Sequence, residues 1–245
     1  MRYLVNMSYN GSLFFGYQIQ NDEVTVEGEL EKVLSKILNT SINTIASSRT
    51  DRGVHANDQY CHFDYDKELD TSKLTHSINS LINDGIYVKS IKKVSDDFHA
   101  RYNVVSKEYI YKINMGEYNP IEKDIVFQYN KKIEKSLIDK YIKLLNGKHN
   151  FKSFTSDKEA NNYERDLIMD YKVKDNLLIL RFESSGFLRY MIRNIVGLLL
   201  DINEGKKSLE DIKFIFDSKD RCSLGMCACP TGLYLNKVNY WHIIN

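Results

Sequence analysis

A polar loop between two strand-like segments restricts the fold of this chain more than any other feature of its sequence. The loop covers residues 47–56, after the apolar-rich residues 42–46 and before the alternating residues 59–66. Gly53 permits a backbone conformation that other residues rarely adopt, which suits a turn between strands. Functional side chains often lie on loops with rigid flanks, so residues 47–56 are the first candidate for a site.

The charges in this loop direct attention to Asp51. Arg49 and Arg52 flank it, and two nearby positive charges favour the ionised form of a carboxyl group whose ordinary pKa is about 4. An ionised carboxylate can act as a nucleophile. The same residues also fit an ordinary turn, because Asp with Gly two residues later is a common turn signal. Local chemistry alone leaves both interpretations open.

Composition sets broad limits on the class of protein. The chain has 245 residues, of which 42% are hydrophobic and 27% charged, as in ordinary globular proteins. Its richest apolar stretch, residues 195–200, is far too short for a membrane span, and residues 1–12 lack a signal-peptide core. We therefore expect a cytoplasmic protein that has no membrane partner. The net charge of +1 neither favours nor excludes nucleic acid, so RNA binding would require basic residues gathered on one face.

The cysteines do not have the spacing of a structural zinc site. There are four, and the last three are separated by four residues and then one: Cys61, Cys222, Cys227 and Cys229. We expect free thiols and no metal. His62, Asp64 and Asp66 share one face of a strand and are of metal-ligating types, but an exposed sheet face explains them more simply. A metal-dependent hydrolase using His62, Asp64 and the cysteines is one rival hypothesis.

Hydrophobic periodicity predicts an α+β protein. In the first part, strands are expected over 2–8, 59–66 and 86–94 and helices over 27–38 and 74–82, in the ferredoxin-like order strand, helix, strand, helix, strand. In the second part, strands are expected over 104–114 and after Pro230, and a hairpin over 167–173 and 177–183. Helices are expected over 136–145, 187–203 and 208–217. We divide the chain into an N-terminal α+β subdomain, 1–103, with a catalytic loop at 47–58, and a C-terminal one, 104–245.

The loop sequence Arg-Thr-Asp-Arg-Gly-Val-His-Ala resembles the signature of the tRNA pseudouridine synthase A family, which acts on uridines 38, 39 and 40 in the anticodon stem and loop. Similar blocks follow in the family's order: Phe98-His99-Ala100-Arg101, the strand with Tyr109, residues 147–154, residues 191–197 and the closing Pro-Thr-Gly-Leu. Three departures are Arg52, where the family more often has a small residue, Asn150, where it usually has Asp, and Cys229 before the closing Pro, where it usually has Ala.

The resemblance implies roles for particular residues. Asp51 would be the nucleophile, Arg193 would contact it and keep it charged, and Arg49 would assist the flipping of the target base. Tyr109 would stack on the uracil. The full set of expected substrate-binding residues is Tyr109, Arg52, His55 and Arg101. Attack at the sugar C1′, attack at the ring C6 and a glycal route all stay open, as do the roles of Arg189 and of the basic loop 148–158.

The resemblance also implies an architecture and partners. We expect two ferredoxin-like halves with mainly antiparallel sheets, forming one continuous catalytic domain with a basic RNA-binding cleft. The partner would be the anticodon arm of tRNA, bound by a homodimer, and no cofactor is expected because the isomerisation involves no net oxidation. The main rival from another class is a catalytically silent RNA-binding module, which would keep basic and aromatic residues without needing Asp51.

Overall fold

The computed structural model describes residues 1–241, which form two compact units. Among the described residues, unit 1 contains 1–107 and 234–241, and unit 2 contains 108–233. This division differs from the sequence-based one at 103/104 in two ways. Strand β5 (Val104–Asn114) starts in unit 1 and continues into unit 2, and the last strand returns to unit 1. The last strand belongs to unit 1 because it pairs in parallel with the strand that contains the end of the signature loop, residues 47–56.

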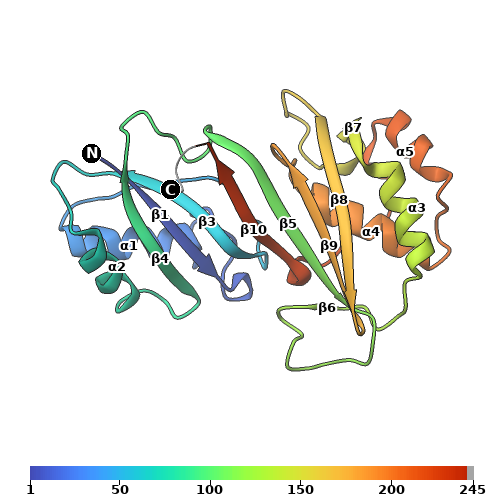
Figure 1. Ribbon diagram of the computed structural model, residues 1–245, viewed down its shortest axis with the longest axis horizontal. Coiled ribbons are helices and arrows are strands. Elements are labelled where there is room, and N and C mark those ends of the chain that lie inside the picture. Colours follow the sequence, from blue (N-terminus) through green and yellow to red (C-terminus); the bar gives the residue numbers. More distant parts are fainter. Residues whose placement is uncertain (242–245) are drawn as a thin grey trace. The chain divides into compact units, whose positions relative to one another are not determined.

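Unit 1 is built on mainly antiparallel strands in the order β4-β1-β3-β10 (Figure 1). Its elements in chain order are β1 (Arg2–Tyr9), α1 (Val26–Leu38), β2 (Ile45–Ala46), β3 (His55–Asp64), α2 (Thr71–Asn79), β4 (Ile86–Val94) and β10 (Leu233–Tyr240). The alternating strands and the two helices agree with the predicted order, and the α+β class is confirmed.

Helix α1 shows how the sequence sets the elements of unit 1. The Thr25 hydroxyl caps its start by accepting the Gly28 N–H at 3.2 Å, and the helix ends where Asn39 takes a left-handed conformation, with φ of 53°. Leu30, Val33 and Leu34 recur at the three-four spacing and are buried. Burial of this apolar face holds α1 in the unit.

Unit 2 has strands in the order β5-β9-β8-β7 (Figure 1). Its elements after β5 are, in chain order, β6 (Phe127–Gln128), α3 (Lys135–Leu145), β7 (Gly147–Asn150), β8 (Glu164–Lys174), β9 (Leu177–Ser184), α4 (Met191–Asn203) and α5 (Asp211–Ser218). Strands β8 and β9 form the predicted antiparallel hairpin, and Asp175 at its turn has a positive φ of 54°.

Helix α4 starts later than predicted. It begins at Met191 and not at residue 187, because Tyr190 has a left-handed conformation with φ of 63° that breaks the helix. A helix over 187–203 would place Arg189 one turn from Arg193, and this expectation is wrong because Arg189 lies before the helix. Both guanidinium groups still converge, since they lie 4.9 and 5.1 Å from the centroid of the Tyr190 ring.

The expectation that His62 lies on an exposed sheet face is also wrong. Its side chain is 2% exposed, and Nδ1 accepts the backbone N–H of Ala100 at 3.1 Å. The segment 95–103 covers this part of β3. Phe98 and Ala100 pack there with Leu4 as a buried cluster.

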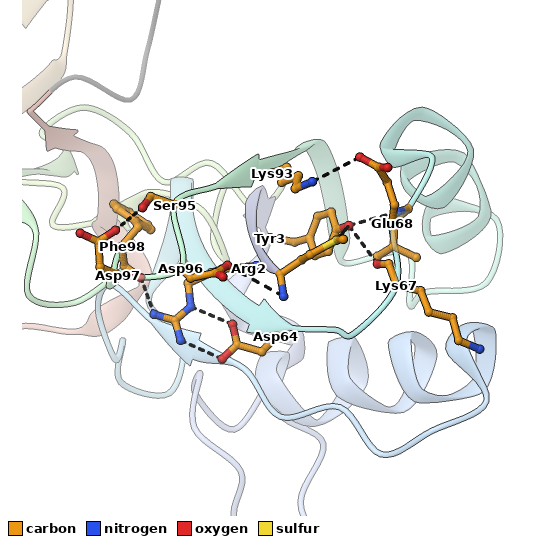
Figure 2. A network of polar contacts seen from close by, with 12 residues as sticks. Arg2, Tyr3, Asp64, Lys67, Glu68, Lys93, Ser95, Asp96, Asp97 and Phe98 are labelled. Atoms are coloured by element: carbon orange, nitrogen blue, oxygen red, sulfur yellow. Dashed lines mark hydrogen bonds and ion pairs between the residues drawn. The ribbon is translucent and has the colours of Figure 1, made fainter.

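Arg2 holds the covering segment to the sheet, as Figure 2 shows. Its guanidinium donates to both carboxylate oxygens of Asp64 at 2.8 and 2.7 Å and to the carbonyl of Phe98 at 2.7 Å. The backbone N–H of Arg2 donates to Asp96 at 3.1 Å. Charge-assisted bonds of this kind are strong and directional, so one arginine on β1 fixes both β3 and the segment that buries His62.

Two further expectations concern thiols and membranes. All four cysteines are free, as predicted, and Cys61 is buried. None of the helices within residues 1–241 combines the length and apolar character that crossing a bilayer requires. Over the same residues, no three His, Cys, Asp or Glu side chains are grouped so that they could hold a metal ion.

Candidate active site

The signature loop forms a tight turn that presents Asp51. Residues 55 and 56 belong to β3, so the irregular part covers residues 47–54. The Val54 N–H donates to the Asp51 carbonyl at 3.1 Å, and Gly53 has a positive φ of 79°, as expected for a glycine in this turn. Asp51 is half-buried, whereas Arg49 and Arg52 on either side are exposed. A carboxylate thus lies on a closed turn between two solvent-facing cations.

The end of the loop is fixed to the turn after β1. A Cβ atom on Gly11 would lie 2.0 Å from the Val54 carbonyl oxygen, so only glycine fits there. The Gly11 N–H donates to His55 Nδ1 at 3.1 Å, and the His55 ring stacks on Tyr234 with centroids 4.5 Å apart. His55 is buried, so this predicted substrate-binding residue lies inside the scaffold of the loop.

The start of the loop rests on a buried amide. Gln59 on β3 is 0% exposed and donates through Nε2 to the Ser48 carbonyl at 2.8 Å. Its Oε1 accepts the Ser47 hydroxyl at 2.7 Å. Buried polar atoms in proteins normally have hydrogen-bond partners, and those of the Gln59 amide include the first two loop residues, Ser47 and Ser48.

Thr50, the residue before Asp51, is held from two directions. Its hydroxyl and that of Tyr9 are 2.7 Å apart, and its carbonyl accepts the Tyr17 N–H at 3.1 Å. The Thr50 side chain is buried. The backbone on the N-terminal side of Asp51 is therefore fixed by side chain and main chain together.

Lys107 contacts the loop from β5. Its Nζ donates to the Ser47 carbonyl at 2.5 Å. Burial lowers the pKa of the Lys107 ammonium to about 8, and the charge of Arg101 acts in the same direction. Sequence reasoning missed this lysine. It could have been found by position, because Lys107 is two and four residues before Tyr109 and Tyr111 and therefore shares their strand face.

The arginines of unit 1 have distinct surroundings. The Arg52 guanidinium lies 4.0 Å from the centroid of the Phe15 ring, a cation–π contact that supports an exposed charge. Burial raises the pKa of Glu27, against the opposing effects of the Ile19 N–H bond and of the nearby charge of Arg49. Arg101 is exposed, and its backbone N–H donates to His99 Nδ1 at 3.1 Å.

Two predicted site residues belong to unit 2. The first, Tyr109, is 7% exposed and meets Phe187 edge to face, with ring centroids 5.2 Å apart. Tyr109 and Tyr111 lie two residues apart on β5, and both are buried. On the alternate parity, Glu108 joins an ion-pair cluster around Arg181.

The second, Arg193, is near the start of α4. Its Nε donates to the Ala228 carbonyl at 2.8 Å, and its own carbonyl accepts the Ala228 N–H at 3.0 Å. The adjacent Asn194 donates to the Phe154 carbonyl at 2.8 Å. The backbone before Pro230 and the 147–154 block thus brace the same turn of the helix.

The departure at Asn150 leaves the local geometry satisfied. Asn150 Oδ1 accepts the Lys152 N–H at 3.0 Å, a bond that an aspartate oxygen could also accept. In the basic loop, Lys148 pairs with Glu164 at 3.0 Å, and Lys152 lies 5.5 Å from the centroid of the Tyr163 ring. Part of the basic charge of this loop is therefore already matched within the protein.

Comparison with known proteins gives a consistent result. A family model described as tRNA pseudouridine synthase matches residues 6–103 and 141–241. Three curated relatives, all named tRNA pseudouridine synthase A, are similar over nearly their full length. The Geobacillus sp. protein is 37% identical over 96% of both chains. The Malacoplasma penetrans protein is 37% identical over 98% of this chain and 100% of its own, and the Mycoplasma genitalium protein is 38% identical over 98% of both.

Proposed function

Because the chain belongs to the tRNA pseudouridine synthase family, we propose that it isomerises uridines 38, 39 and 40 in the anticodon stem and loop of tRNAs, with Asp51 as the nucleophile. Family membership makes the chain a tRNA-modifying isomerase. The observation that carries the finer proposal is the signature turn. Its backbone is fixed by buried groups on both sides of Asp51, while Arg49 and Arg52 face solvent, where RNA phosphates would approach.

The reaction requires little more than a positioned carboxylate. The N1–C1′ glycosidic bond breaks, the uracil turns, and C5 bonds to C1′. C5 loses a proton and N1 gains one, so the atoms and electrons of the nucleotide are unchanged overall. Asp51 starts the reaction by attack at C1′, by attack at C6 or by assisting a glycal route. Arg193 is proposed to contact Asp51 and keep it ionised, which suits a guanidinium already oriented by its bond to Ala228.

The target base must leave its stack, which costs a few kcal/mol. We assign Arg49 to the space that the base vacates and Tyr109 to the uracil, where stacking returns roughly 1–3 kcal/mol. Phe187 fixes the edge of the Tyr109 ring. Arg52 and Arg101 are exposed and are assigned to phosphates. His55, being buried, is assigned to the support of the loop. We further propose a cytoplasmic homodimer in which the tRNA bridges the two subunits.

The Asp51→Asn variant tests this proposal. It removes the nucleophilic charge while keeping shape, and we expect a folded protein that binds tRNA normally or slightly tighter and forms no pseudouridine. Asp66→Asn is the matched control, since Asp66 is exposed and follows β3. Melting temperature, tRNA affinity and pseudouridine yield are measured on the same samples. Residual turnover of Asp51→Asn within about tenfold of wild type, roughly 1.4 kcal/mol of barrier, is too small a loss for a covalent nucleophile.

The proposed positions need a separate measurement. Pseudouridine is mapped in tRNA from cells that lack the gene, with and without the gene restored on a plasmid. We expect uridines 38, 39 and 40 of the tRNA to be unmodified in cells that lack the gene and to be modified again when the gene is restored. Loss at a different tRNA position would keep the isomerase and replace the proposed substrate site. A wild-type protein that binds tRNA and forms no pseudouridine would support the RNA-binding module instead.

A further inference from the structure

We propose that Lys107 is a positioning residue for the reaction, because it holds the first residue of the signature loop in the place that Asp51 needs. This inference rests on the function proposed above and deepens it. Lys107 contacts the Ser47 carbonyl from β5 at 2.5 Å, and Ser47 is only a few residues before Asp51 in the loop. It has no assigned role in the chemistry itself.

The surroundings of Lys107 are unusual for a lysine. In the part of the chain that the structure describes, its ammonium is met by a backbone carbonyl, with no carboxylate at ion-pair distance. A half-buried cation without a counter-charge costs free energy, whereas several exposed lysines of unit 1 pair with carboxylates, as Lys93 does with Glu68 at 3.2 Å. A costly group beside a functional loop points to a task that depends on its donor.

A chain of hydrogen bonds carries the effect of Lys107 along the loop. Ser47, whose carbonyl Lys107 holds, donates its hydroxyl to Gln59 Oε1 at 2.7 Å. Gln59 Nε2 donates to the Ser48 carbonyl at 2.8 Å and to the Tyr9 hydroxyl at 3.4 Å. The Tyr9 hydroxyl in turn contacts Thr50 Oγ1 at 2.7 Å.

These bonds form one connected network under residues 47–50, entirely within unit 1. Networks of buried hydrogen bonds act together, so loss of the Lys107 donor loosens more than a single contact. Displacement of a reacting group by about 1 Å can cost roughly 100-fold in rate. The expected consequence is therefore a change in turnover, with the tRNA-binding surface left intact.

The test is Lys107→Met, which keeps the length of the side chain and removes its donor. We expect single-turnover pseudouridine formation at saturating tRNA to fall about 10- to 100-fold, while tRNA affinity changes less than about threefold. Lys107→Arg keeps a donor and should restore most of the rate. Amide hydrogen exchange of residues 48–54 should become faster in Lys107→Met, which reports on the loop without any assay of activity.

A matched control is available on β4. Lys89 also donates its Nζ to a backbone carbonyl of β3, that of Asn57, but outside the network under residues 47–50. Lys89→Met should leave both turnover and the exchange of residues 48–54 unchanged. Tyr9→Phe is the milder second variant if Lys107→Met fails to fold. It deletes one hydroxyl of the network and should lower turnover severalfold, with Lys107 intact.

Three results would overturn the inference. The first is unchanged turnover in Lys107→Met. The second is weaker tRNA binding with normal turnover at saturation, which would make Lys107 a phosphate contact. The third is unchanged exchange of residues 48–54. Failure of the proposed function would look different. The wild-type protein would then form no pseudouridine, or Asp51→Asn would still form it. In either case, the exchange rates of residues 48–54 would still show whether Lys107 holds the loop.

Discussion

His55 Nδ1 accepts the backbone N–H of Gly11 at 3.1 Å, so the residue that follows the signature turn also holds the turn after β1. The same approach brings Gly11 against Val54, where a methyl group would have no space. Two segments more than forty residues apart in sequence are thus locked together under the proposed nucleophile. Rigid support of this kind is what a catalytic loop requires.

Gly11→Ala should destabilise the protein and disturb the loop. The added Cβ would meet the carbonyl of Val54 at 2.0 Å, and backbone atoms cannot swing away as a flexible side chain would. Overpacking of this kind costs roughly 1–3 kcal/mol, so the melting temperature should fall by several degrees. Gly186→Ala is the control, since no atom lies within 4 Å of the place that its methyl group would take. Equal melting temperatures for the two variants would contradict the close approach.

Acid should destabilise the protein partly through His62. Burial lowers its pKa from 6.5 to about 4, with the charges of Arg2 and His99 acting in the same direction. Between these values the unfolded chain binds a proton that the folded protein does not. The stabilising contribution is therefore complete above pH 6.5 and is lost as the pH falls towards 4, by at most about 3 kcal/mol.

His62→Asn removes this titration and keeps an acceptor for the Ala100 N–H. Urea unfolding at several pH values from 4 to 7.5 should give a shallower loss of stability for the variant than for the wild type. Wild type and variant must be compared because carboxylates also titrate between pH 4 and 7.5, and their contribution is the same in both proteins. Parallel curves for the two proteins would mean that His62 is protonated equally in both states.

Arg49→Ala should lower turnover on structured tRNA far more than it weakens binding. Arg49 is exposed two residues before Asp51, whereas affinity for RNA is shared among many phosphate contacts. We expect a loss of about tenfold or more in turnover at saturating tRNA, with dissociation constants compared at fixed salt. A large loss of affinity with normal turnover would assign Arg49 to electrostatic attraction alone.

Tyr109 offers a test of ring against hydroxyl. Tyr109→Phe keeps the aromatic face and the edge contact with Phe187, so turnover and affinity should stay close to wild type. Tyr109→Leu removes the face, and a loss of roughly 1–3 kcal/mol of stacking predicts a fall in turnover of about 5- to 150-fold. If Phe is as inactive as Leu, the hydroxyl has a chemical task such as proton transfer at C5.

Local periodicity is sufficient to predict most of the elements. The face of α1 with Leu30, Val33 and Leu34 follows from three-four spacing, and the positive φ of Gly53 follows from the needs of a short turn. The left-handed Tyr190 does not follow, because no sequence signal marks a tyrosine for that conformation. Periodicity therefore places the start of α4 too early, and Arg189 with it.

Burial by distant segments is harder to predict. Alternation correctly separates His62 from Cys61 and Phe63, and Asp64 and Asp66 are exposed as expected, but His62 is covered by a segment more than thirty residues later. Lys107 shows the converse. Its parity with Tyr109 places it on the inward face, where it is half-buried, but alternation does not predict that its ammonium donates to the Ser47 carbonyl.

The last strand has a consequence for the order in which the protein can fold. Within β10, Tyr234 and Leu235 pair with His55 and Ala56, the residues that end the signature loop. During synthesis, the ribosome releases Tyr234 and Leu235 after nearly the whole of unit 2 has already emerged. Strand β3 pairs with β1 and β2 from the start of the chain, but its β10 neighbour becomes available only after the residues of unit 2, so unit 1 is completed later than unit 2 is synthesised.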